Sequence, residues 1–304
     1  MSKTFKAIQY DAYGGFEVLS LKTLQLPVPG AGEVLIKVRF AGVNPVDWKL
    51  RSGVLHAFMP VTFPGKPGID VSGVIEAVGP GVTNWKKGQA VLGAAQGSYA
   101  EFAIAKATDI VAKPEKLSFE AAASLPVGAL TAWALVEEAG VKAGQRVLVQ
   151  GAAGGVGLFA LQFAKLKVAR VTGTSSTANV EFVKKLGADE ALDYSQGPLT
   201  VKDFDVVIDT VGGAVLSSSY GLLKKGGVIV TPAGQPSAEE ANAHGVTAKA
   251  VNRGAISFLA GIADLVAVKK VVTEIQKIFS LKDAAKAHEL SQGGHGRGRI
   301  LIKI

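Results

Sequence analysis

The fold of this chain is decided by one stretch, Val147-Leu148-Val149-Gln150-Gly151-Ala152-Ala153-Gly154-Gly155-Val156-Gly157. Its apolar start has the length of a buried strand, and a helix pattern follows the glycines. Gly151 permits a tight turn, and Gly157 lets the helix pack closely on the strand. Gly154 and Gly155 let a pyrophosphate approach the backbone, where the amino end of the helix offers unpaired N–H groups and a partial positive charge. The stretch predicts a dinucleotide-binding turn, with a plain structural turn as the alternative.

Strands and helices alternate around this turn, starting at Ser118, a capping residue that precedes an Ala-rich segment. Short apolar runs predict strands at 145–150, 169–174, 191–194, 204–209 and 228–232. Helix patterns lie between them, at 155–167, at 178–186 and in a segment that ends at residue 223. This alternation predicts βαβ units in a doubly wound parallel sheet. Residues 234–250, which are polar and contain Gly, Ala and Pro, are expected to form a loop.

The flanking regions have a different pattern. In the first 120 residues, turn signals separate short strand patterns at 32–40, 71–79, 99–105 and 109–113. They predict a mostly β lobe, a partly closed barrel. Near the carboxyl end, the pattern predicts one long helix over 258–279, a second helix near 282–290 and a closing strand over 299–304.

Composition narrows the class of protein. Of 304 residues, 48% are hydrophobic and 19% are charged, which places the chain far from disordered sequences. No apolar run reaches the roughly 18 residues of a membrane helix and no secretory segment is visible, so a cytoplasmic protein is expected. The chain has no cysteine, which excludes disulfides and thiolate zinc sites. The net charge of +8 suits a phosphate-rich cofactor, and no block of like charges favours nucleic acid.

The second strand of the predicted sheet bears on the choice of cofactor. In NAD sites an acidic side chain about twenty residues after the turn binds the ribose 2′-hydroxyl. Here that strand ends Val171-Thr172-Gly173-Thr174-Ser175-Ser176-Thr177, without a carboxylate. Hydroxyl groups can donate to a 2′-phosphate, which an acid would repel. The sequence therefore predicts NADPH.

The whole chain resembles a known family, the quinone oxidoreductase (zeta-crystallin-like) branch of the medium-chain dehydrogenase/reductases. The matching stretches keep the family's order and are Ala41–Gly53, Pro67–Gly73, Leu130–Trp133, the glycine turn, Leu186–Asp189 and Gly293–Ile300. The resemblance implies that residues 1–120 and 256–304 form a β-rich, GroES-like catalytic lobe, a partly open barrel. Residues 121–255 would form the dinucleotide-binding Rossmann domain inserted into it. It also implies a homodimer, and hydride transfer to a quinone or to the β-carbon of an α,β-unsaturated carbonyl.

The resemblance also implies a metal-free catalytic site. Zinc-dependent cousins use cysteine and histidine ligands, whereas this chain lacks cysteine and its histidines have no ligand spacing. We expect all four histidines at the surface: His56, His244, His288 and His295. Without a metal, hydrogen-bond donors must stabilise charge on the substrate oxygen. Asn44 matches the family's substrate-side asparagine, with an Asn-Pro turn as the alternative. Lys49 replaces a tyrosine of some relatives and either stabilises an enolate or supplies the proton. The alternative is a solvated lysine, with water as the proton donor.

The resemblance assigns cofactor contacts to the ends of several strands. Thr131 would lie near the nicotinamide ribose, unless it is only a helix hydroxyl, and Tyr194 would flank the 2′-phosphate. The full predicted set is Thr131, Gly151, Ala153, Gly154, Gly155, Val156, Gly157, Thr174, Ser175, Ser176, Asn179, Tyr194, Thr210, Val211, Ala233, Gly234 and Arg297. Relatives commonly carry a cation where this chain has Ala178-Asn179. The NADPH preference is therefore weaker than usual unless Lys184, Lys185 or Arg297 reaches the phosphate.

A competing hypothesis is a protein that keeps the dinucleotide fold for binding alone, such as a nucleic-acid binder. The net charge of +8 and the Gly/Arg-rich segment Gly293–Arg299 are its basis. A serine hydrolase is discarded, because the chain has no Gly-x-Ser-x-Gly elbow.

Overall fold

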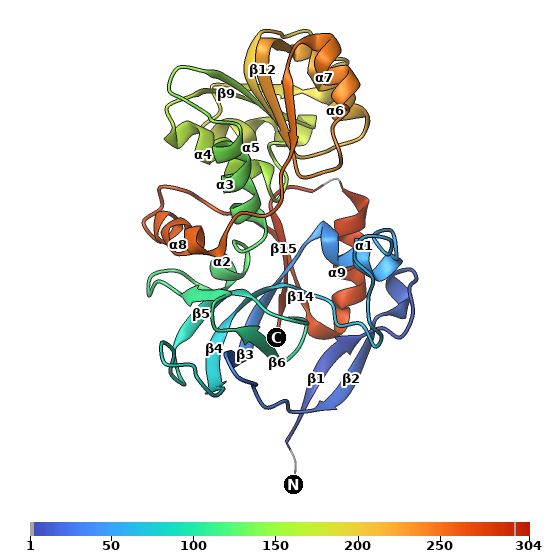
Figure 1. The fold of residues 1–304 in the computed structure, drawn as a ribbon, viewed down its shortest axis with the longest axis vertical. Coiled ribbons are helices and arrows are strands. Elements are labelled where there is room, and N and C mark those ends of the chain that lie inside the picture. The colour runs from blue at the N-terminus through green and yellow to red at the C-terminus, as the bar shows by residue number, and fades with distance from the viewer. Residues whose placement is uncertain (1–2, 295) are drawn as a thin grey trace. The chain divides into compact units, whose positions relative to one another are not determined.

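The computed structural model describes residues 3–294 and 296–304, and their contacts divide the chain into two units (Figure 1). Unit 1 comprises Met1–Val127, Ile256–Lys270 and Glu274–Ile304, and unit 2 comprises Gly128–Ala255 and Val271–Thr273. The first boundary therefore lies after Val127, seven residues beyond the sequence estimate. Among the described residues, no helix is long and apolar enough to span a membrane.

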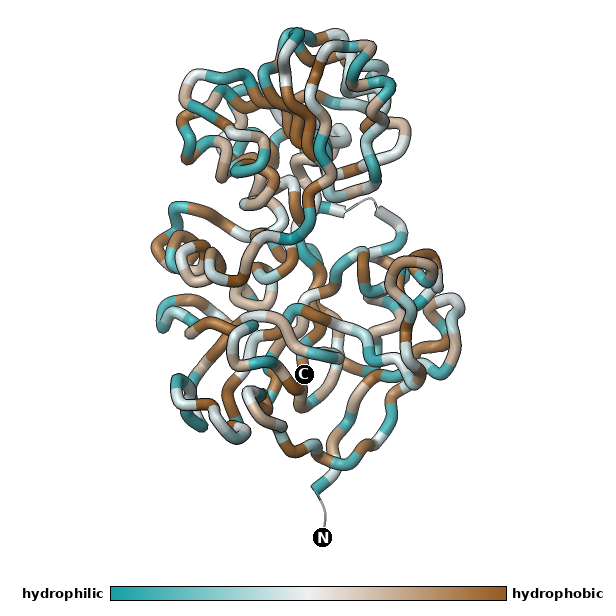
Figure 2. The backbone as a smooth tube through the Cα atoms, in the orientation of Figure 1, coloured by the Kyte–Doolittle hydropathy of each residue, from teal (hydrophilic) through white to brown (hydrophobic). Residues whose placement is uncertain are grey.

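Unit 2 is built on a parallel sheet whose strand order is β10-β9-β8-β11-β12-β13. The strands are β8 (Arg146–Gln150), β9 (Arg170–Ser175), β10 (Glu190–Asp193), β11 (Phe204–Asp209), β12 (Leu223–Thr231) and β13 (Thr247–Ala250). The order reverses between β8 and β11, the point at which doubly wound sheets bind their ligands. The central strands are apolar over nearly their whole length (Figure 2), as expected for a sheet covered on both faces. The predicted doubly wound parallel sheet is confirmed.

Short helices accompany this sheet: α3 (Gly128–Glu138), α4 (Gly157–Leu166), α5 (Val180–Lys185), α6 (Ala214–Ser219) and α7 (Ala238–His244). Helices α3 and α4 pack together, with the rings of Trp133 and Phe163 edge to face at 5.2 Å. Phe159 and Phe163 are almost completely buried on α4, so the helix that follows the glycine turn is anchored in the core of unit 2.

The predicted loop over 234–250 is wrong, because it contains α7 and the edge strand β13. The hydroxyl of Ser237 accepts a hydrogen bond from the Glu240 N–H and caps α7, which ends at Gly245 in a left-handed conformation. A cap followed by glutamates and a closing glycine is a helix signal despite the polar composition. Strand β13 has little strand propensity of its own, and it forms because β12 supplies the hydrogen-bonding partner.

Unit 1 is mostly β. One sheet has the order β14-β15-β3-β4-β5-β7, with β6 also paired to β3, and β1 pairs with β2 in a separate two-stranded sheet. The strands are β1 (Thr4–Gln9), β2 (Ser20–Gln25), β3 (Glu33–Val43), β4 (Asp70–Val78), β5 (Ala90–Ala94), β6 (Phe102–Lys106), β7 (Ile110–Ala112), β14 (Ile275–Ser280) and β15 (Arg299–Lys303). The long central strand β3 pairs with β15, β4 and β6, and its buried side chains Val34, Ile36 and Val38 lie in the core of this unit.

The helices of unit 1 are α1 (Pro45–Ser52), α2 (Phe119–Ala123), α8 (Leu259–Ala267) and α9 (Ala284–Gly293). The predicted long helix over 258–279 is wrong, because α8 ends at Ala267 and the chain then forms β14. Lys269, at a positive φ of 59°, turns the chain out of the helix. Strand β14 exists because β15 pairs with it in parallel, a partner that no local pattern reveals.

Candidate active site and cofactor site

The glycine turn joins β8 to α4, and its backbone conformation and close contacts require residues without a side chain. Gly151 has a φ of +69°, a conformation that other residues rarely adopt. A Cβ atom on Gly157 would lie 2.1 Å from the Gly151 carbonyl oxygen, and one on Gly154 would lie 3.2 Å from the same atom. At the start of α4, the N–H groups of Leu158, Phe159 and Ala160 donate to the carbonyls of Gly154 and Val156 in the turn, so the turn and the helix form one continuous backbone path. The turn therefore presents bare backbone at a helix amino end, which suits a phosphate.

Strand β9 holds the turn from inside the protein. The Thr174 hydroxyl accepts from the Gly151 N–H at 3.1 Å and donates to Gln150 Oε1 at 2.7 Å. The Thr174 carbonyl accepts from the Ala152 N–H at 2.9 Å. Thr174 is buried and its hydroxyl is engaged on both sides, so its side chain supports the turn rather than facing outward.

The parallel strands bring most of the remaining predicted cofactor residues to one edge of the sheet. In register, Asp209 lies beside Gln150, so Thr210 and Val211 follow β11 next to the glycine turn. The buried Asp209 carboxylate accepts from the Val211 and Gly212 N–H groups and from the Thr231 hydroxyl, which fixes this corner. A pocket of about 350 Å³ lies at the same edge, and its lining includes the predicted residues Ala233 and Gly234.

The turn after β9 forms its own hydrogen-bonded corner. The Ser175 hydroxyl is buried and donates to the Ser176 carbonyl, and Asn179 Nδ2 donates to Ser176 Oγ at 3.1 Å. Tyr194, which follows β10, is half exposed. Asp193 lies beside Ser175 in the register of β10 and β9.

Asp193 is a charged residue of this corner that the sequence analysis missed. Its Oδ2 accepts from the Thr177 hydroxyl at 2.6 Å, and Ser195 donates to its Oδ1. These hydrogen bonds, first from Ser195 and then from Thr177, lower the pKa of the Asp193 carboxyl to about 2. The corner predicted to accept a 2′-phosphate thus contains a permanent negative charge, and it uses the Thr177 hydroxyl to hold it. Asp193 caps the short turn that follows, which is the signal that could have found it.

Asn44 lies in unit 1, where β3 ends and α1 begins, with Pro45 at the first helical position. Its Oδ1 accepts a hydrogen bond from Arg299 Nη2 at 2.7 Å. Its Nδ2 is buried and has no acceptor among residues 3–294 and 296–304. The same Arg299 nitrogen donates to Asp70 Oδ2 at 2.9 Å, and this ion pair is buried on both sides. Neither Arg299 nor Asp70 was assigned a role from the sequence.

A buried carboxyl anchors the backbone of Asn44. Asp47 Oδ2 accepts from the Asn44 N–H at 2.8 Å and from the Tyr99 hydroxyl at 3.0 Å. Burial raises the pKa of the Asp47 carboxyl to about 7, although both hydrogen bonds act against the shift. The Asn-Pro turn is thus present and the side-chain amide of Asn44 is buried, while its role toward the substrate stays a prediction.

Comparisons with known proteins identify the family of the chain. Residues 30–115 match the family described as Alcohol dehydrogenase GroES-like domain, and residues 186–302 match the one described as Zinc-binding dehydrogenase. A chloroplastic quinone-oxidoreductase homolog of Spinacia oleracea is 35% identical over 326 residues, which cover 99% of each chain. The chain belongs to the quinone oxidoreductase branch of the medium-chain dehydrogenase/reductase superfamily.

Solved structures place this quinone oxidoreductase family member in the same fold. The quinone oxidoreductase from Coxiella burnetii has a TM-score of 0.92 and 36% identity, over 99% of this chain and 100% of that one. A mycobacterial protein solved in complex with NADPH has a TM-score of 0.89 and 31% identity, over 99% of this chain and 100% of its own. The chain is therefore a nicotinamide-dependent oxidoreductase, and a protein that only binds nucleic acid is not favoured.

Two of the predicted cofactor residues do not follow a strand of the parallel sheet. Thr131 is buried within α3, at 6% exposure. Arg297 belongs to unit 1, where its guanidinium forms an ion pair with Glu274 at 3.1 Å. Lys184, a second candidate cation for the 2′-phosphate, forms an ion pair with Glu181 on α5.

Lys49 lies on α1, a turn after Asn44. Its side chain is half-buried, and its Nζ lies 5.7 Å from the centroid of the Trp48 ring. It takes no part in the hydrogen bonds of Asn44 described above. The structure thus brings Asn44 together with Arg299, Asp70 and Asp47, and Lys49 lies nearby on the same helix.

The expectation that all histidines lie at the surface is wrong for His288. His56 and His244 are exposed, whereas His288 is fully buried on α9, edge to face with Tyr99 at 5.5 Å. Burial lowers the pKa of His288 to about 3, so its ring is neutral at physiological pH. Helix α9 packs against α1, and His288 is buried on it together with Ala284 and Ala287. His295 lies outside the described residues. Within the described part of the chain, no group of three or more His, Asp or Glu could hold a metal ion.

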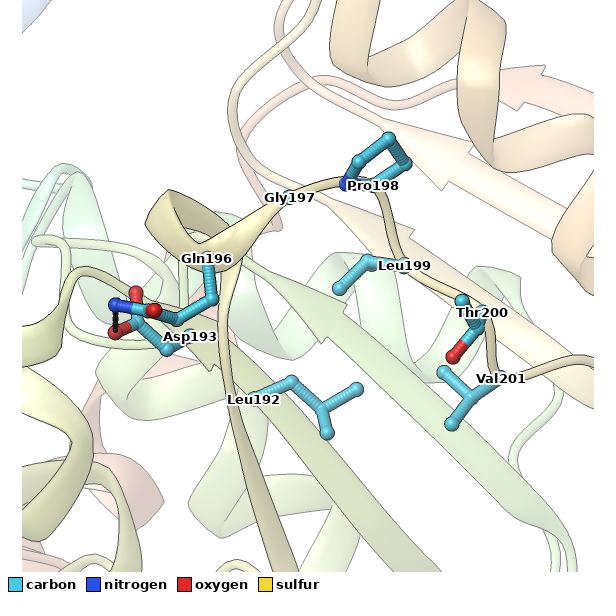
Figure 3. A pocket seen from close by; sticks show the side chains of 8 residues that line it. All are labelled: Leu192, Asp193, Gln196, Gly197, Pro198, Leu199, Thr200 and Val201. Carbon is cyan, nitrogen blue, oxygen red and sulfur yellow. Dashed lines mark hydrogen bonds between the residues drawn. The ribbon is translucent and has the colours of Figure 1, made fainter.

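A second pocket, of about 170 Å³, lies beyond the end of β10 (Figure 3). Its lining residues are Leu192, Asp193, Gln196, Gly197, Pro198, Leu199, Thr200 and Val201. Gln196 Nε2 donates to Asp193 Oδ2 at 3.2 Å. None of the lining residues is a predicted cofactor residue, and the one charged group among them is negative. This pocket is therefore not suited to a phosphate.

Proposed function

We propose that this protein is an NADPH-dependent reductase that transfers hydride, without a metal, to quinones or to α,β-unsaturated carbonyls. The observation that carries the proposal is the glycine turn, whose bare backbone lies at the point where the strand order reverses. The family membership and the mycobacterial relative solved with NADPH agree with it.

On the cofactor side, the pyrophosphate would rest against the backbone of Gly154–Gly157. The adenosine 2′-phosphate would meet Ser176, Asn179 and Tyr194, while Thr210, Val211, Ala233 and Gly234 would contact the rest of the cofactor. A turn whose backbone leaves no room for a Cβ at Gly157 and little at Gly154 is what close approach of a dinucleotide requires. When bound, NADPH supplies the hydride and leaves as NADP⁺.

On the acceptor side, Asn44 would donate from Nδ2 to the carbonyl oxygen. As the hydride adds to the β-carbon, the C=C electron pair forms a new double bond between the α-carbon and the carbonyl carbon. The C=O electron pair moves onto the oxygen, which becomes negative. Donors aimed at the oxygen stabilise this charge, and a proton from Lys49 or from water completes the reduction. Overall, acceptor, NADPH and one proton give the two-electron-reduced acceptor and NADP⁺. The apolar and exposed segment Val54–Phe63 would contact hydrophobic acceptors.

The test is oxidation of NADPH and of NADH, followed at 340 nm, against quinones, alkenals and furanones. Turnover with at least one acceptor, faster with NADPH than with NADH, is the expected result. Inactivity with every acceptor of the panel would contradict the proposed reductase activity. A strong, salt-dependent affinity for RNA in the inactive protein would instead favour the binding hypothesis.

Two further properties are proposed with the function. One is a homodimer, for which the edge strand β13 offers an unpaired ladder, and light scattering on the purified protein checks it. The other is a cytoplasmic location, which imaging of a tagged chain checks, since the spinach relative is chloroplastic by name.

A further inference from the structure

We propose that Arg299 is a positioning residue, which fixes the side-chain amide of Asn44 so that it can act only as a hydrogen-bond donor toward the acceptor oxygen. The inference rests on the proposed function for the identity of the acceptor, but the orientation of the amide can be tested without turnover.

The backbone of unit 1 places the two residues side by side. Strand β3 pairs with β15 on one side, with Val43 opposite Ile300, and with β4 on the other, with Gly42 opposite Asp70. Arg299 and Asn44 are the next residues along their strands, so the antiparallel register sets them next to each other. Three neighbouring strands thus line up a guanidinium, an amide and a carboxylate.

The contacts between these groups are direct and buried. Arg299 Nη2 donates to Asn44 Oδ1 at 2.7 Å and to Asp70 Oδ2 at 2.9 Å. Asp70 is held in turn, because its Oδ1 accepts from the Val127 N–H at 2.9 Å. Asn44 and Asp70 are fully buried, and Arg299 is 3% exposed. In such an interior the attraction between a guanidinium and an amide oxygen is much stronger than in water.

The charge of Arg299 leaves the amide one orientation. An amide carries an acceptor at its oxygen and two donors at its nitrogen. If it were flipped, the NH₂ group would face the cation and two donors would oppose each other. The oxygen is therefore committed to Arg299, and the two N–H bonds point away from it. The Asn44 backbone is fixed as well, since its N–H donates to the buried Asp47.

The free N–H donors of the oriented Asn44 amide suit an acceptor whose oxygen becomes negative during the reaction. Nδ2 is buried and has no acceptor within the described part of the chain, so a ligand oxygen is the partner that its hydrogens lack. A donor held in place before the reaction stabilises a developing oxyanion better than one that must reorient. The alternative is that Arg299 only neutralises Asp70 and has no influence on the reaction.

A double-mutant cycle separates these two roles. The variants are R299K, which keeps the positive charge beside Asp70, N44A, and the two combined. We expect N44A to lower kcat by about 10²-fold and R299K by about 10-fold, with unchanged affinity for NADPH. In the N44A background R299K should cause no further loss of kcat, because Arg299 acts through the amide. K303M, a change of an exposed cation on the same strand, is the matched control and should leave kcat unchanged.

Two outcomes of the cycle would overturn the proposal: an unchanged kcat in R299K, or equal losses of kcat from R299K with and without Asn44. Neither outcome touches the proposed function, which stands on turnover by the unmodified protein.

A second measurement does not require turnover. In protein labelled with ¹⁵N at asparagine, the side-chain NH₂ signals of Asn44 are assigned by their loss in N44A. R299K should move these signals and K303M should leave them in place. Unmoved signals in R299K would overturn the proposal, even if the unmodified protein reduced no acceptor and the proposed function had already failed.

Discussion

Units 1 and 2 build their candidate sites from different material. Unit 2 uses backbone: its glycine turn works because side chains are missing at Gly151, Gly154 and Gly157. Unit 1 uses side chains: a buried amide, a guanidinium and two carboxyl groups held by one another. The residues of a backbone site are neighbours in the sequence, so a short stretch is enough to predict it. The residues of a side-chain network come from strands that are far apart in the sequence and adjacent only in the folded chain.

The largest effect on cofactor binding is expected from a side chain added within the glycine turn of unit 2. In Gly157→Ala the new Cβ would lie 2.1 Å from the Gly151 carbonyl oxygen, so the turn must move. We expect a loss of NADPH binding in a fluorescence titration and a fall in unfolding free energy of about 1–3 kcal/mol. Gly261→Ala, on α8 with open space around its Cβ, is the control and should keep NADPH affinity unchanged. Unchanged NADPH affinity in Gly157→Ala would contradict the assignment of a backbone cofactor site to unit 2.

The next effect should separate chemistry from cofactor binding. Asn44→Asp keeps the size of the side chain but removes the two N–H donors. Because the cofactor site is assigned to unit 2, we expect kcat to fall by about 10²–10³-fold while the Kd of NADPH stays the same. Steady-state kinetics with a quinone and a binding titration measure the two quantities. Asn242→Asp, at an exposed position on α7, serves as the control; a parallel loss of NADPH affinity in Asn44→Asp would contradict the assignment.

The stability of unit 1 should depend on pH through the buried Asp47. The pKa of Asp47 is raised by burial to about 7, so between about pH 4 and pH 7 the folded protein holds a proton that the unfolded chain has lost. Its contribution to stability is therefore present at low pH and is lost as the pH rises through about 7. Thermal unfolding from pH 5 to pH 8 should show this decline, and D47N should flatten it, since an amide oxygen can still accept from Asn44 and Tyr99. An equal slope in D47N would assign the decline to another group.

The smallest effect is expected at Asp193 in unit 2, which is half-buried and whose carboxylate remains charged down to about pH 2. D193N removes a negative charge from the corner predicted to hold the 2′-phosphate. We expect the ratio of kcat/KM for NADPH over NADH to rise by about 2–5-fold, and the gain to shrink at high salt. D203N changes an exposed carboxylate just before β11, at the opposite edge of the sheet, and should leave the ratio unchanged. No rise in D193N would mean that the 2′-phosphate lies elsewhere.

The sequence predicted the parts of the fold that local patterns determine. The β8–turn–α4 unit carries both a strand run and a glycine spacing, and the doubly wound sheet follows from the alternation around it. One error came where a partner strand decides the structure: 258–279 was predicted as a single helix, yet its end pairs with β15 and forms β14. The loop predicted over 234–250 overlooked a serine cap and a closing glycine, which outweigh polar composition.

The candidate site was predictable to a similar extent. The glycines and the ends of the parallel strands follow from pattern, and Asn44 came from family resemblance. The hydrogen bonds around Asn44 could not be predicted from the sequence. Arg299 is 255 positions from Asn44 and 229 positions from Asp70, and it donates to both side chains. Only strand register brings such residues together, and a single sequence does not state register.

The long separation between Asn44 and Arg299 has a consequence for the order in which a growing chain acquires its parts. On the ribosome, Asn44 emerges early, and its guanidinium partner is made 255 residues later, after all of unit 2. The middle of the chain can thus complete its sheet while unit 1 still waits for β14 and β15. A nascent chain halted near residue 255 would already contain the glycine turn proposed to bind the nucleotide, yet lack Arg299, which is proposed to position the Asn44 amide.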